Sequence, residues 1–203
     1  MFSFRAPSGD DVRRLLERQR DLPFPYPGAG MSRQGRGPEG FQAAHHRVRL
    51  GTGQAAFDRA RAAVRAWTMF RMDWVRLYWP TAPIETGTAV AMAAHTMGFW
   101  TVNASRIVYT LDERGSVEIF GFACGTLPHH VERGEERFSV QWDHADDSVW
   151  YDLWSFSRPG HLLVRLGEPL ARRLQQRFVA ASLEAMARAC RTFPGNDLSN
   201  RVG

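Results

Sequence analysis

The sequence contains no lysine, so all 26 of its basic residues are arginines. Without lysine the chain cannot form a lysine Schiff base, hold pyridoxal phosphate through a lysine, or build the lysine-dependent phosphate-binding loop. The arginines are spread from Arg5 to Arg201 among 21 acidic residues, with no dense basic tract and no motif of a nucleic-acid-binding domain. We therefore expect no nucleic acid among its partners, although the net charge is +5.

Cysteine is scarce as well: Cys124 and Cys190 are isolated and form no CxxC pair. Nothing at the N-terminus resembles a secretion signal, and every apolar run is interrupted well before the roughly 20 residues that a membrane-spanning helix needs. We expect a cytoplasmic protein without a membrane span. The seven histidines have no HxH or HExxH spacing, so we expect neither a metal site nor a cofactor.

Apolar residues are plentiful by contrast, at 44% of 203 residues with 12% aromatic residues, which is typical of one globular domain. Residues 1–40 are expected to form an N-terminal helix and a Pro/Gly-rich arm packed on the body. Residues 41–193 are expected to form the domain itself, and residues 194–203 a flexible tail.

Hydrophobic periodicity and turn residues predict the order of the elements. Ser8, followed by two aspartates in the first turn, begins a short amphipathic helix that ends near Asp21. After the arm we expect a strand, a helix and a short strand at residues 41–50, 54–70 and 74–79. Five strands follow at residues 87–95, 99–111, 117–127, 135–144 and 148–157. A long helix with an apolar stripe that includes Leu163 and Leu166 comes last, and Pro169 is expected to interrupt or kink it.

This order predicts an α+β fold in which a curved antiparallel sheet wraps around the long C-terminal helix. A sheet curved around one helix commonly leaves a cavity between them. Trp142, Trp150 and Trp154 lie close together in this sheet and supply more aromatic surface than one helix can cover. That surplus favours an apolar ligand over a solid interior.

Several short motifs in the same region form a recognisable set: Arg47 to Gly51, Asn103 to Tyr109, Gly121 to Pro128, Gly134 to Phe138 and Phe156 to Pro159. Together they resemble the domain-of-unknown-function family numbered nineteen-ninety, over nearly the whole chain from Tyr26 onward. That family is similar to the birch-pollen-allergen and START-like helix-grip folds. The resemblance therefore implies a helix-grip fold with a cavity for a hydrophobic ligand, and it implies no particular reaction. The chain departs from the family at Cys124, where the family usually has Tyr, and at His129, where it usually has Gly.

The stretch from Gly121 to Phe138 combines histidines, glutamates and arginines between two predicted strands. If the following turn lies near Asp146, antiparallel pairing brings the two glutamates of this stretch opposite residues 155–157. We therefore expect a polar cluster at one end of the sheet, bordering the mouth of the cavity: Thr126, His129, His130, Glu135, Glu136, Ser157 and Arg158.

Side-chain alternation along the strands predicts which residues face the cavity. One face carries Phe120, Phe122, Cys124, Thr126, Glu136, Phe138, Val140 and Trp142. On the next strand two sets remain open, and a change of one residue in the turn exchanges them: Val149, Tyr151, Leu153 and Ser155, or Trp150, Asp152, Trp154 and Phe156. In the second set Asp152 would lie in an aromatic pocket, where desolvation would raise its pKa.

Three functions are compatible with this pattern. The first is binding of a small, mostly apolar molecule, held at its polar end by Thr126, Glu136 and Arg158 and surrounded by Phe122, Cys124, Phe138, Trp142, Tyr151 and Trp154. The second is an enzyme of specialised metabolism, such as a cyclase, isomerase or hydrolase, with Glu136, His129 or Asp152 as its acid or base. The third is a structural or interaction protein with a packed interior. Neither the ligand nor the oligomeric state follows from the sequence.

The same residues also have purely structural interpretations. His129 suits a loop, and Glu136 could form an ion pair with Arg158 or Arg137 that fixes the hairpin. Ser157 suits a cap, since no GxSxG motif accompanies it. Cys124 among phenylalanines would be an inert buried thiol rather than a nucleophile.

Overall fold

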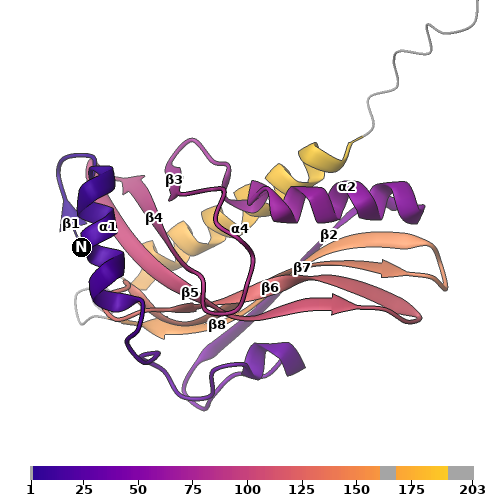
Figure 1. Ribbon diagram of the computed structural model, residues 1–203, viewed down its shortest axis with the longest axis horizontal. Helices are drawn as coiled ribbons and strands as arrows, with labels where there is room; N and C mark the ends of the chain where they lie inside the picture. The colour runs from indigo at the N-terminus through magenta and orange to yellow at the C-terminus, as the bar shows by residue number, and fades with distance from the viewer. Residues whose placement is uncertain (1, 161–167, 192–203) are drawn as a thin grey trace, which may run out of the picture.

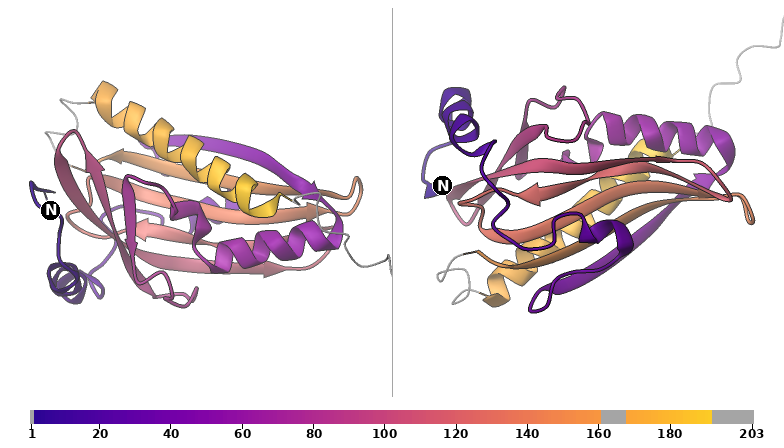
Figure 2. Two further views of the ribbon diagram at one scale, coloured as in Figure 1. Left: turned by 90° about the horizontal axis from the view of Figure 1, so that it is seen from above. Right: turned by 60° about the horizontal axis from the view of Figure 1, so that its bottom comes forward.

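The computed structural model describes residues 2–160 and 168–191. A curved antiparallel sheet has two helices, α2 and α4, on one face and the N-terminal arm on the other (Figures 1 and 2). The predicted α+β fold, with the sheet curved around a long C-terminal helix, is confirmed. None of the helices in the described part of the chain is long and apolar enough to span a membrane.

Within the described residues eight strands form one sheet in the order β2-β8-β7-β6-β5-β4-β3, and the short β1 (Phe2–Ser3) pairs with β5. Consecutive strands from β3 to β8 are neighbours, so the predicted antiparallel meander is confirmed. The strands are β2 (Gln42–Thr52), β3 (Val75–Tyr78), β4 (Ala89–Thr96), β5 (Phe99–Glu113), β6 (Val117–Thr126), β7 (Glu132–Asp143) and β8 (Ser148–Pro159).

The helices follow the predicted order, with differences at their ends. They are α1 (Gly9–Gln19), α2 (Gly53–Arg65) and α4 (Glu168–Cys190), with short 3-10 helices η1 (Met31–Gln34) and η2 (Thr68–Phe70). Ser8 caps α1 with a reciprocal capping box to Asp11, as its position before the aspartates predicted.

The helix predicted to reach residue 70 ends earlier. Trp67 adopts a left-handed backbone conformation with φ of 53°, which an α-helix cannot contain. The indole Nε1 of Trp67 donates a hydrogen bond to the carbonyl oxygen of Ala82 at 3.1 Å. Leu163 and Leu166, expected in the C-terminal helix, lie outside the described residues, as does the predicted tail. Pro169 lies in the first described turn of α4, and the helix continues from there to Cys190 without interruption.

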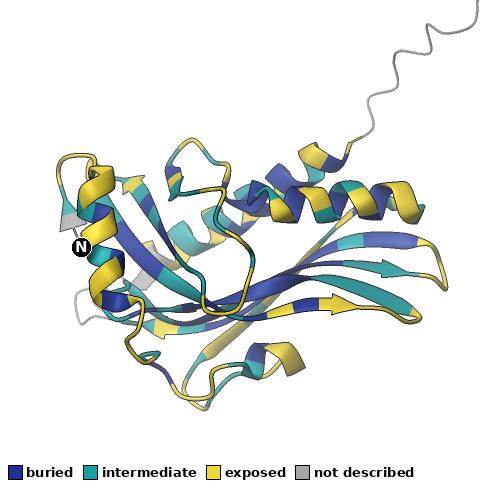
Figure 3. Ribbon diagram, in the orientation of Figure 1, coloured by how far each residue is buried: buried dark blue, intermediate teal, exposed yellow. Residues whose placement is uncertain are grey.

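The main core lies between one half of the sheet and the two elements that cover it, α2 and the C-terminal half of α4. Trp67 packs against Phe122 with ring centroids 4.8 Å apart, and Phe57 packs against Trp142 at 5.8 Å. Tyr151 is buried there and its hydroxyl lies 2.9 Å from that of Ser182 on α4. Figure 3 shows the buried residues concentrated in the sheet and on the sheet-facing sides of the helices. The other half of the sheet, under the N-terminal half of α4, is where a cavity remains.

The arm formed by residues 22–40 lies on the opposite face of the sheet (Figure 2, right). Its attachment point is the buried carboxylate of Glu135, which accepts hydrogen bonds from the backbone N–H of Gly30 at 2.8 Å and of Ser32 at 3.2 Å. The hydroxyls of Tyr26, at 3.2 Å, and of Ser32 also donate to it. Four donors thus fix the arm to one side chain of β7.

The register of β7 with β8 decides which side of β8 faces the helices. Phe138 lies opposite Leu153 and Val140 opposite Tyr151, so the set that contains Tyr151 shares the inner face. Asp152, a candidate acid or base, and Trp154, a candidate ligand contact, lie on the outer face instead, so both predictions were wrong. Trp154 packs beside Phe156 under the arm.

Asp152 is buried on that outer face in a cluster of basic side chains. Its carboxylate oxygens lie 3.0 Å from Nη2 of Arg137, 3.4 Å from Nε of Arg47 and 2.6 Å from Nε2 of His45. Nη1 of Arg137 also donates to the carbonyl oxygen of Ser32 at 3.0 Å. The alternative that placed Asp152 in an aromatic pocket is therefore wrong, since its neighbours are basic side chains that connect β2, β7 and the arm.

Candidate functional site

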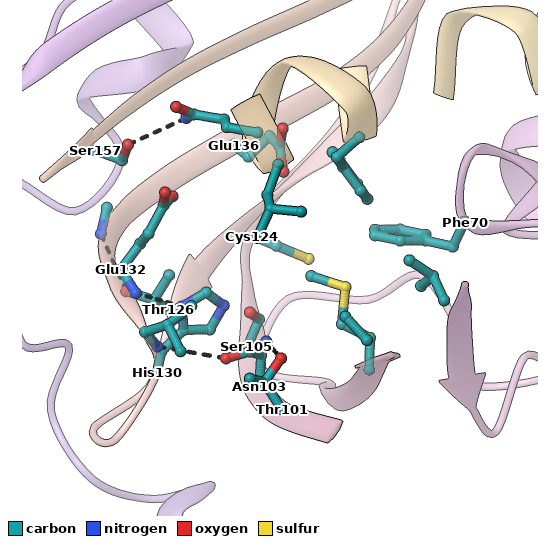
Figure 4. A pocket seen from close by; sticks show the side chains of 18 of the residues that line it. Phe70, Thr101, Asn103, Ser105, Cys124, Thr126, His130, Glu132, Glu136 and Ser157 are labelled. Atoms are coloured by element: carbon teal, nitrogen blue, oxygen red, sulfur yellow. Dashed lines mark hydrogen bonds between the residues drawn. The ribbon is translucent and has the colours of Figure 1, made fainter. Parts of the chain in front are cut away.

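A cavity of about 580 Å³ lies between the inner face of the sheet and the N-terminal half of α4. Its walls come from β3 to β8, from η2 and from the helix residues Leu170, Leu174, Gln175 and Phe178. Segments far apart in the sequence therefore converge on one space. Figure 4 shows polar side chains on one side of this space and Phe70 on the other.

Most of the cavity wall is apolar. Phenylalanine rings come from η2, β7 and α4, and methionine and branched side chains come from β3 and β4: Phe70, Phe138, Phe178, Val75, Leu77 and Met92. Met97, Phe99 and Leu170 line the same cavity and are exposed to solvent. Large apolar side chains that are both cavity-lining and exposed mark the place where the cavity meets the surface.

The polar end of the cavity is built by the turn between β6 and β7 and by the end of β8. The hydroxyl of Thr126 accepts a hydrogen bond from the N–H of Gly134 at 3.0 Å, and Nδ1 of His130 accepts one from the N–H of Glu132 at 3.0 Å. Nε2 of Gln175 donates to the Ser157 hydroxyl at 3.3 Å. These bonds fix the backbone of the turn and attach α4 to the sheet at this point.

Glu136 projects into the cavity from β7, opposite Cys124 on β6 and Ser155 on β8. Burial in the apolar surroundings and the nearby charge of Glu132 raise the pKa of the Glu136 carboxyl from 4.5 to about 8. Among the described residues, no hydrogen bond or ion pair satisfies this carboxyl group. At neutral pH it is therefore mostly a neutral acid, able both to donate and to accept a hydrogen bond.

Glu132 is the second carboxyl group on the same face of β7 and also lines the cavity. Burial raises the pKa of its carboxyl, and a hydrogen bond with Ser157 partly offsets that effect. Two carboxyl groups with raised pKa values and one imidazole, that of His130, thus face one apolar space. Such groupings are typical of sites that bind ligands or transfer protons.

Several sequence-predicted site residues do line the cavity, namely Thr126, Cys124, Glu136 and Phe138. Burial raises the pKa of the Cys124 thiol far above its usual range, which agrees with the interpretation of an inert buried thiol. Hairpin geometry predicted the two glutamates opposite residues 155–157, and Glu136 lies opposite Ser155 within that range. His130 and Ser157, expected in the polar cluster at the mouth, line the cavity as well.

Three further predicted ligand contacts share the inner face but belong to the packed core. Phe122, Trp142 and Tyr151 are covered by α2, by Trp67 and by the C-terminal half of α4, so they support the cavity from behind. Alternation predicted the face of Phe122 and Trp142 correctly, and the face of Tyr151 was one of the two alternatives left open. They lie too far along the strands from the open end of the cavity to form part of its wall.

Two predicted residues at the mouth lie elsewhere. Arg158 is exposed, and its guanidinium group lies 4.6 Å from the ring centroid of Phe41, so the expected ion pair with Glu136 does not form. His129 is exposed in the turn with a left-handed backbone, and it is the adjacent His130 that lines the cavity. Together with Asp152 and Trp154, these residues are not brought to the cavity.

Glu132 and Gln175 are cavity residues that the sequence interpretation did not assign. Glu132 shares the even-numbered face with Glu136, so alternation would have found it if β7 had been extended past Gly134. For Gln175 the apolar stripe of α4 gave no signal, because a polar residue beside a stripe is usually exposed. In the part of the chain that the structure describes, no group of His, Cys, Asp or Glu side chains is placed to hold a metal ion.

Sequence comparison gives extensive matches. The model of the family described as "Domain of unknown function (DUF1990)" matches residues 25–185, which confirms the resemblance noted from the motifs. A UPF0548 protein of Dictyostelium discoideum is 36% identical over 207 residues, covering 93% of this chain and 95% of that protein. A UPF0548 protein of Deinococcus radiodurans is 35% identical over 190 residues, covering 87% of this chain and 92% of that protein.

Solved structures are similar at a lower level. The hypothetical protein jhp0584 from Helicobacter pylori has a TM-score of 0.49 at 10% identity, covering 77% of this chain and 95% of that chain. Human STARD10 has a TM-score of 0.45 at 9% identity, covering 92% of this chain and 80% of that chain. At this level of similarity nothing about the chemistry of the cavity follows from these structures.

Proposed function

We propose that this chain, which belongs to the family described as "Domain of unknown function (DUF1990)", binds a small and mostly apolar molecule in the cavity between its sheet and α4. The observation that carries this proposal is the composition of the cavity wall, which is apolar over most of its surface and polar at one end (Figure 4). Its volume of about 580 Å³ lies within the roughly 300–1,000 Å³ that is usual for small-molecule sites.

The polar end supports a defined orientation of the ligand. Its apolar part would lie among Phe70, Phe138 and Phe178, and its polar group would lie near Glu136 and Thr126. A neutral carboxylic acid can donate a hydrogen bond to a ligand oxygen and accept one from a ligand N–H or O–H. Arg158, expected from the sequence to anchor the polar group, takes no part, because its side chain lies over Phe41.

An enzyme that transfers protons in the same cavity is the second candidate. The observation that favours it is the Glu136 carboxyl, whose raised pKa of about 8 lies close to neutral pH and whose carboxyl group has no partner among the described residues. Such a group can exchange a proton with a bound molecule, as cyclisation or isomerisation requires. Glu132, on the same face of β7, would be the second acid or base.

The test of binding uses a neutral, environment-sensitive probe, N-phenyl-1-naphthylamine, whose fluorescence rises when it leaves water. We expect saturable enhancement with one site per chain. Ala94→Phe, which places a ring inside the cavity, should abolish it, and Ala43→Phe at an exposed position of β2 should leave it unchanged. No enhancement with the wild type, or equal enhancement with both variants, would contradict binding in this cavity.

The enzyme candidate needs a separate comparison. A ligand captured from cell extract would be identified by native mass spectrometry, then incubated with the wild type and with Glu136→Gln. A product that forms only with the wild type would support proton transfer by Glu136. Release of an unchanged ligand from both proteins would leave binding as the function.

A further inference from the structure

We propose that the cavity selects apolar molecules whose polar end is a protonated amine, in preference to molecules of the same shape that end in a carboxylate or a phosphate. This inference rests on the proposed binding function and specifies its ligand class. The observation behind it is that two carboxyl groups, Glu132 and Glu136, line the cavity, while no arginine is found among the described residues that line it.

The separation of charges follows from alternation along β7. The even-numbered Glu132 and Glu136 face inward, and the odd-numbered Arg133 and Arg137 belong to the outer face. Arg137 is held there by Asp152 and by the carbonyl oxygen of Ser32. One strand therefore presents acids to the cavity and guanidinium groups to the opposite side.

Two further arginines, on β8 and α4, lie over aromatic rings. Arg158 lies over the ring of Phe41. Arg177, on α4, lies over the ring of Trp74 at 4.7 Å from its centroid. In a chain whose 26 basic residues are all arginines, an anionic ligand would usually be recognised by a guanidinium group, and the described cavity wall offers none.

Several groups surround Glu136. Cys124 on β6 lies opposite it, Glu132 on β7 and the buried Tyr151 on β8 interact with it electrostatically, and Gln175 on α4 and His130 in the turn line the same cavity. The first four carry no positive charge. Nδ1 of His130 is engaged as the acceptor of a hydrogen bond from the N–H of Glu132. A ligand ammonium group would supply the missing positive charge to both carboxylates.

Binding of an amine would be coupled to loss of a proton. The neutral Glu136 carboxyl and a free ammonium ion would give a carboxylate paired with the ammonium group, and the carboxyl proton would pass to the solvent. Since the pKa of the free Glu136 carboxyl is raised to about 8, the affinity for an amine should rise on the order of 50-fold between pH 6 and pH 8. The amine itself stays protonated over that range, because a simple alkylamine has a pKa near that of lysine, about 10.4.

The test compares decylamine, decanol and decanoate as competitors of the neutral probe N-phenyl-1-naphthylamine at several pH values. At pH 8 we expect the apparent affinity of decylamine, measured by displacement of the probe, to be at least ~10-fold higher than that of decanoate, with decanol between them. Titration calorimetry at pH 7 in buffers of different ionisation enthalpy should show close to one proton released for each decylamine bound.

Variants separate the contribution of Glu136 from a general effect of pH. Glu136→Gln should remove most of the pH dependence of the affinity for decylamine and bring that affinity close to the affinity for decanol. Glu85→Gln, which changes an exposed glutamate outside the cavity, should behave like the wild type.

The outcomes also separate this inference from the proposed function. If the probe binds and decanoate competes as well as decylamine, or none of the three competes, selection for amines is refuted while cavity binding stands. The same holds if Glu136→Gln keeps the full pH dependence. If the probe itself does not bind, cavity binding and amine selection both fail.

Discussion

Replacing Glu136 with Gln should remove most of the pH dependence of folding stability between pH 5 and pH 8. The pKa of this carboxyl is raised from 4.5 to about 8 in the folded protein, mainly by burial and further by the charge of Glu132. In that interval the folded state keeps a proton that the unfolded chain has lost. The stability associated with the neutral acid is therefore complete below pH 4.5 and is lost as the pH rises towards 8.

The size of the effect follows from the size of the shift. One unit of pKa shift corresponds to about 1.4 kcal/mol, so the shift of Glu136 corresponds to about 3 to 5 kcal/mol of unfolding free energy over the interval. Total stabilities of single domains are about 5–15 kcal/mol, so a loss of this size is large. Glu132 adds a contribution of the same sign, because burial raises the pKa of its carboxyl too.

Urea unfolding followed by tryptophan fluorescence, at half-unit steps from pH 5 to pH 8.5, measures this prediction. The wild type should lose stability steadily with rising pH, and Glu136→Gln should be nearly flat apart from the contribution of Glu132. The dependence of the unfolding free energy on urea should stay equal in both proteins, since the surface exposed on unfolding is the same. Glu85→Gln, at an exposed site, should follow the wild type.

Parallel pH curves for the wild type and Glu136→Gln would refute the reasoning. They would mean that the Glu136 carboxyl ionises inside the cavity without cost, either through water or through a cation that compensates it. The proton release expected on amine binding would then lose its basis, and so would the role of Glu136 as an acid near neutral pH.

Two further predictions concern neighbouring residues. Glu135→Gln should lower the unfolding free energy by about 2–4 kcal/mol, because the buried carboxylate accepts hydrogen bonds from Tyr26, Gly30 and Ser32 of the arm; a loss below about 0.5 kcal/mol in urea unfolding would contradict this anchoring role. The Cys124 thiol, whose pKa is raised by burial, should react with iodoacetamide at pH 8 roughly 100-fold more slowly than in the unfolded chain. Mass spectrometry follows the label, and equal rates would contradict its inert state.

The shared face of β6 and β7 and the approximate pairing of β7 with β8 were predictable because both depend on the chain's own periodicity. Alternation placed Cys124, Glu136 and Phe138 on one face, and a turn near Asp146 placed the two glutamates opposite residues 155–157, which agrees with the observed partners Phe156 and Ser155. Strand ends were less predictable, because Gly134 and the preceding histidines resemble a loop. Pairing with the end of β8 extends β7 back to Glu132 instead.

The sequence did not predict where along the sheet the helices α2 and α4 pack. Phe122, Trp142 and Tyr151 have the same pattern as the cavity residues, and only the packing of α2 and α4 turns them into core. Asp152 depended on a turn register that left two answers open. The arm was predicted through its aromatic residues, while its principal polar anchor is the carboxylate of Glu135. The cytoplasmic location stays a prediction.

Adjacent glutamates on β7 have opposite tasks, since Glu135 holds the arm on one side of the sheet and Glu136 serves the cavity on the other. A substitution at an even-numbered position of β7 can therefore change which ligand the cavity accepts, while the odd-numbered positions keep the arm attached. Changes of length are different: inserting or deleting one residue between Glu136 and the turn that joins β7 to β8 would exchange the faces to which Glu135 and Glu136 point, if the strand stayed paired with β8 from that turn. The side chains of the cavity can therefore be replaced one by one, whereas the number of residues between Glu136 and that turn is constrained.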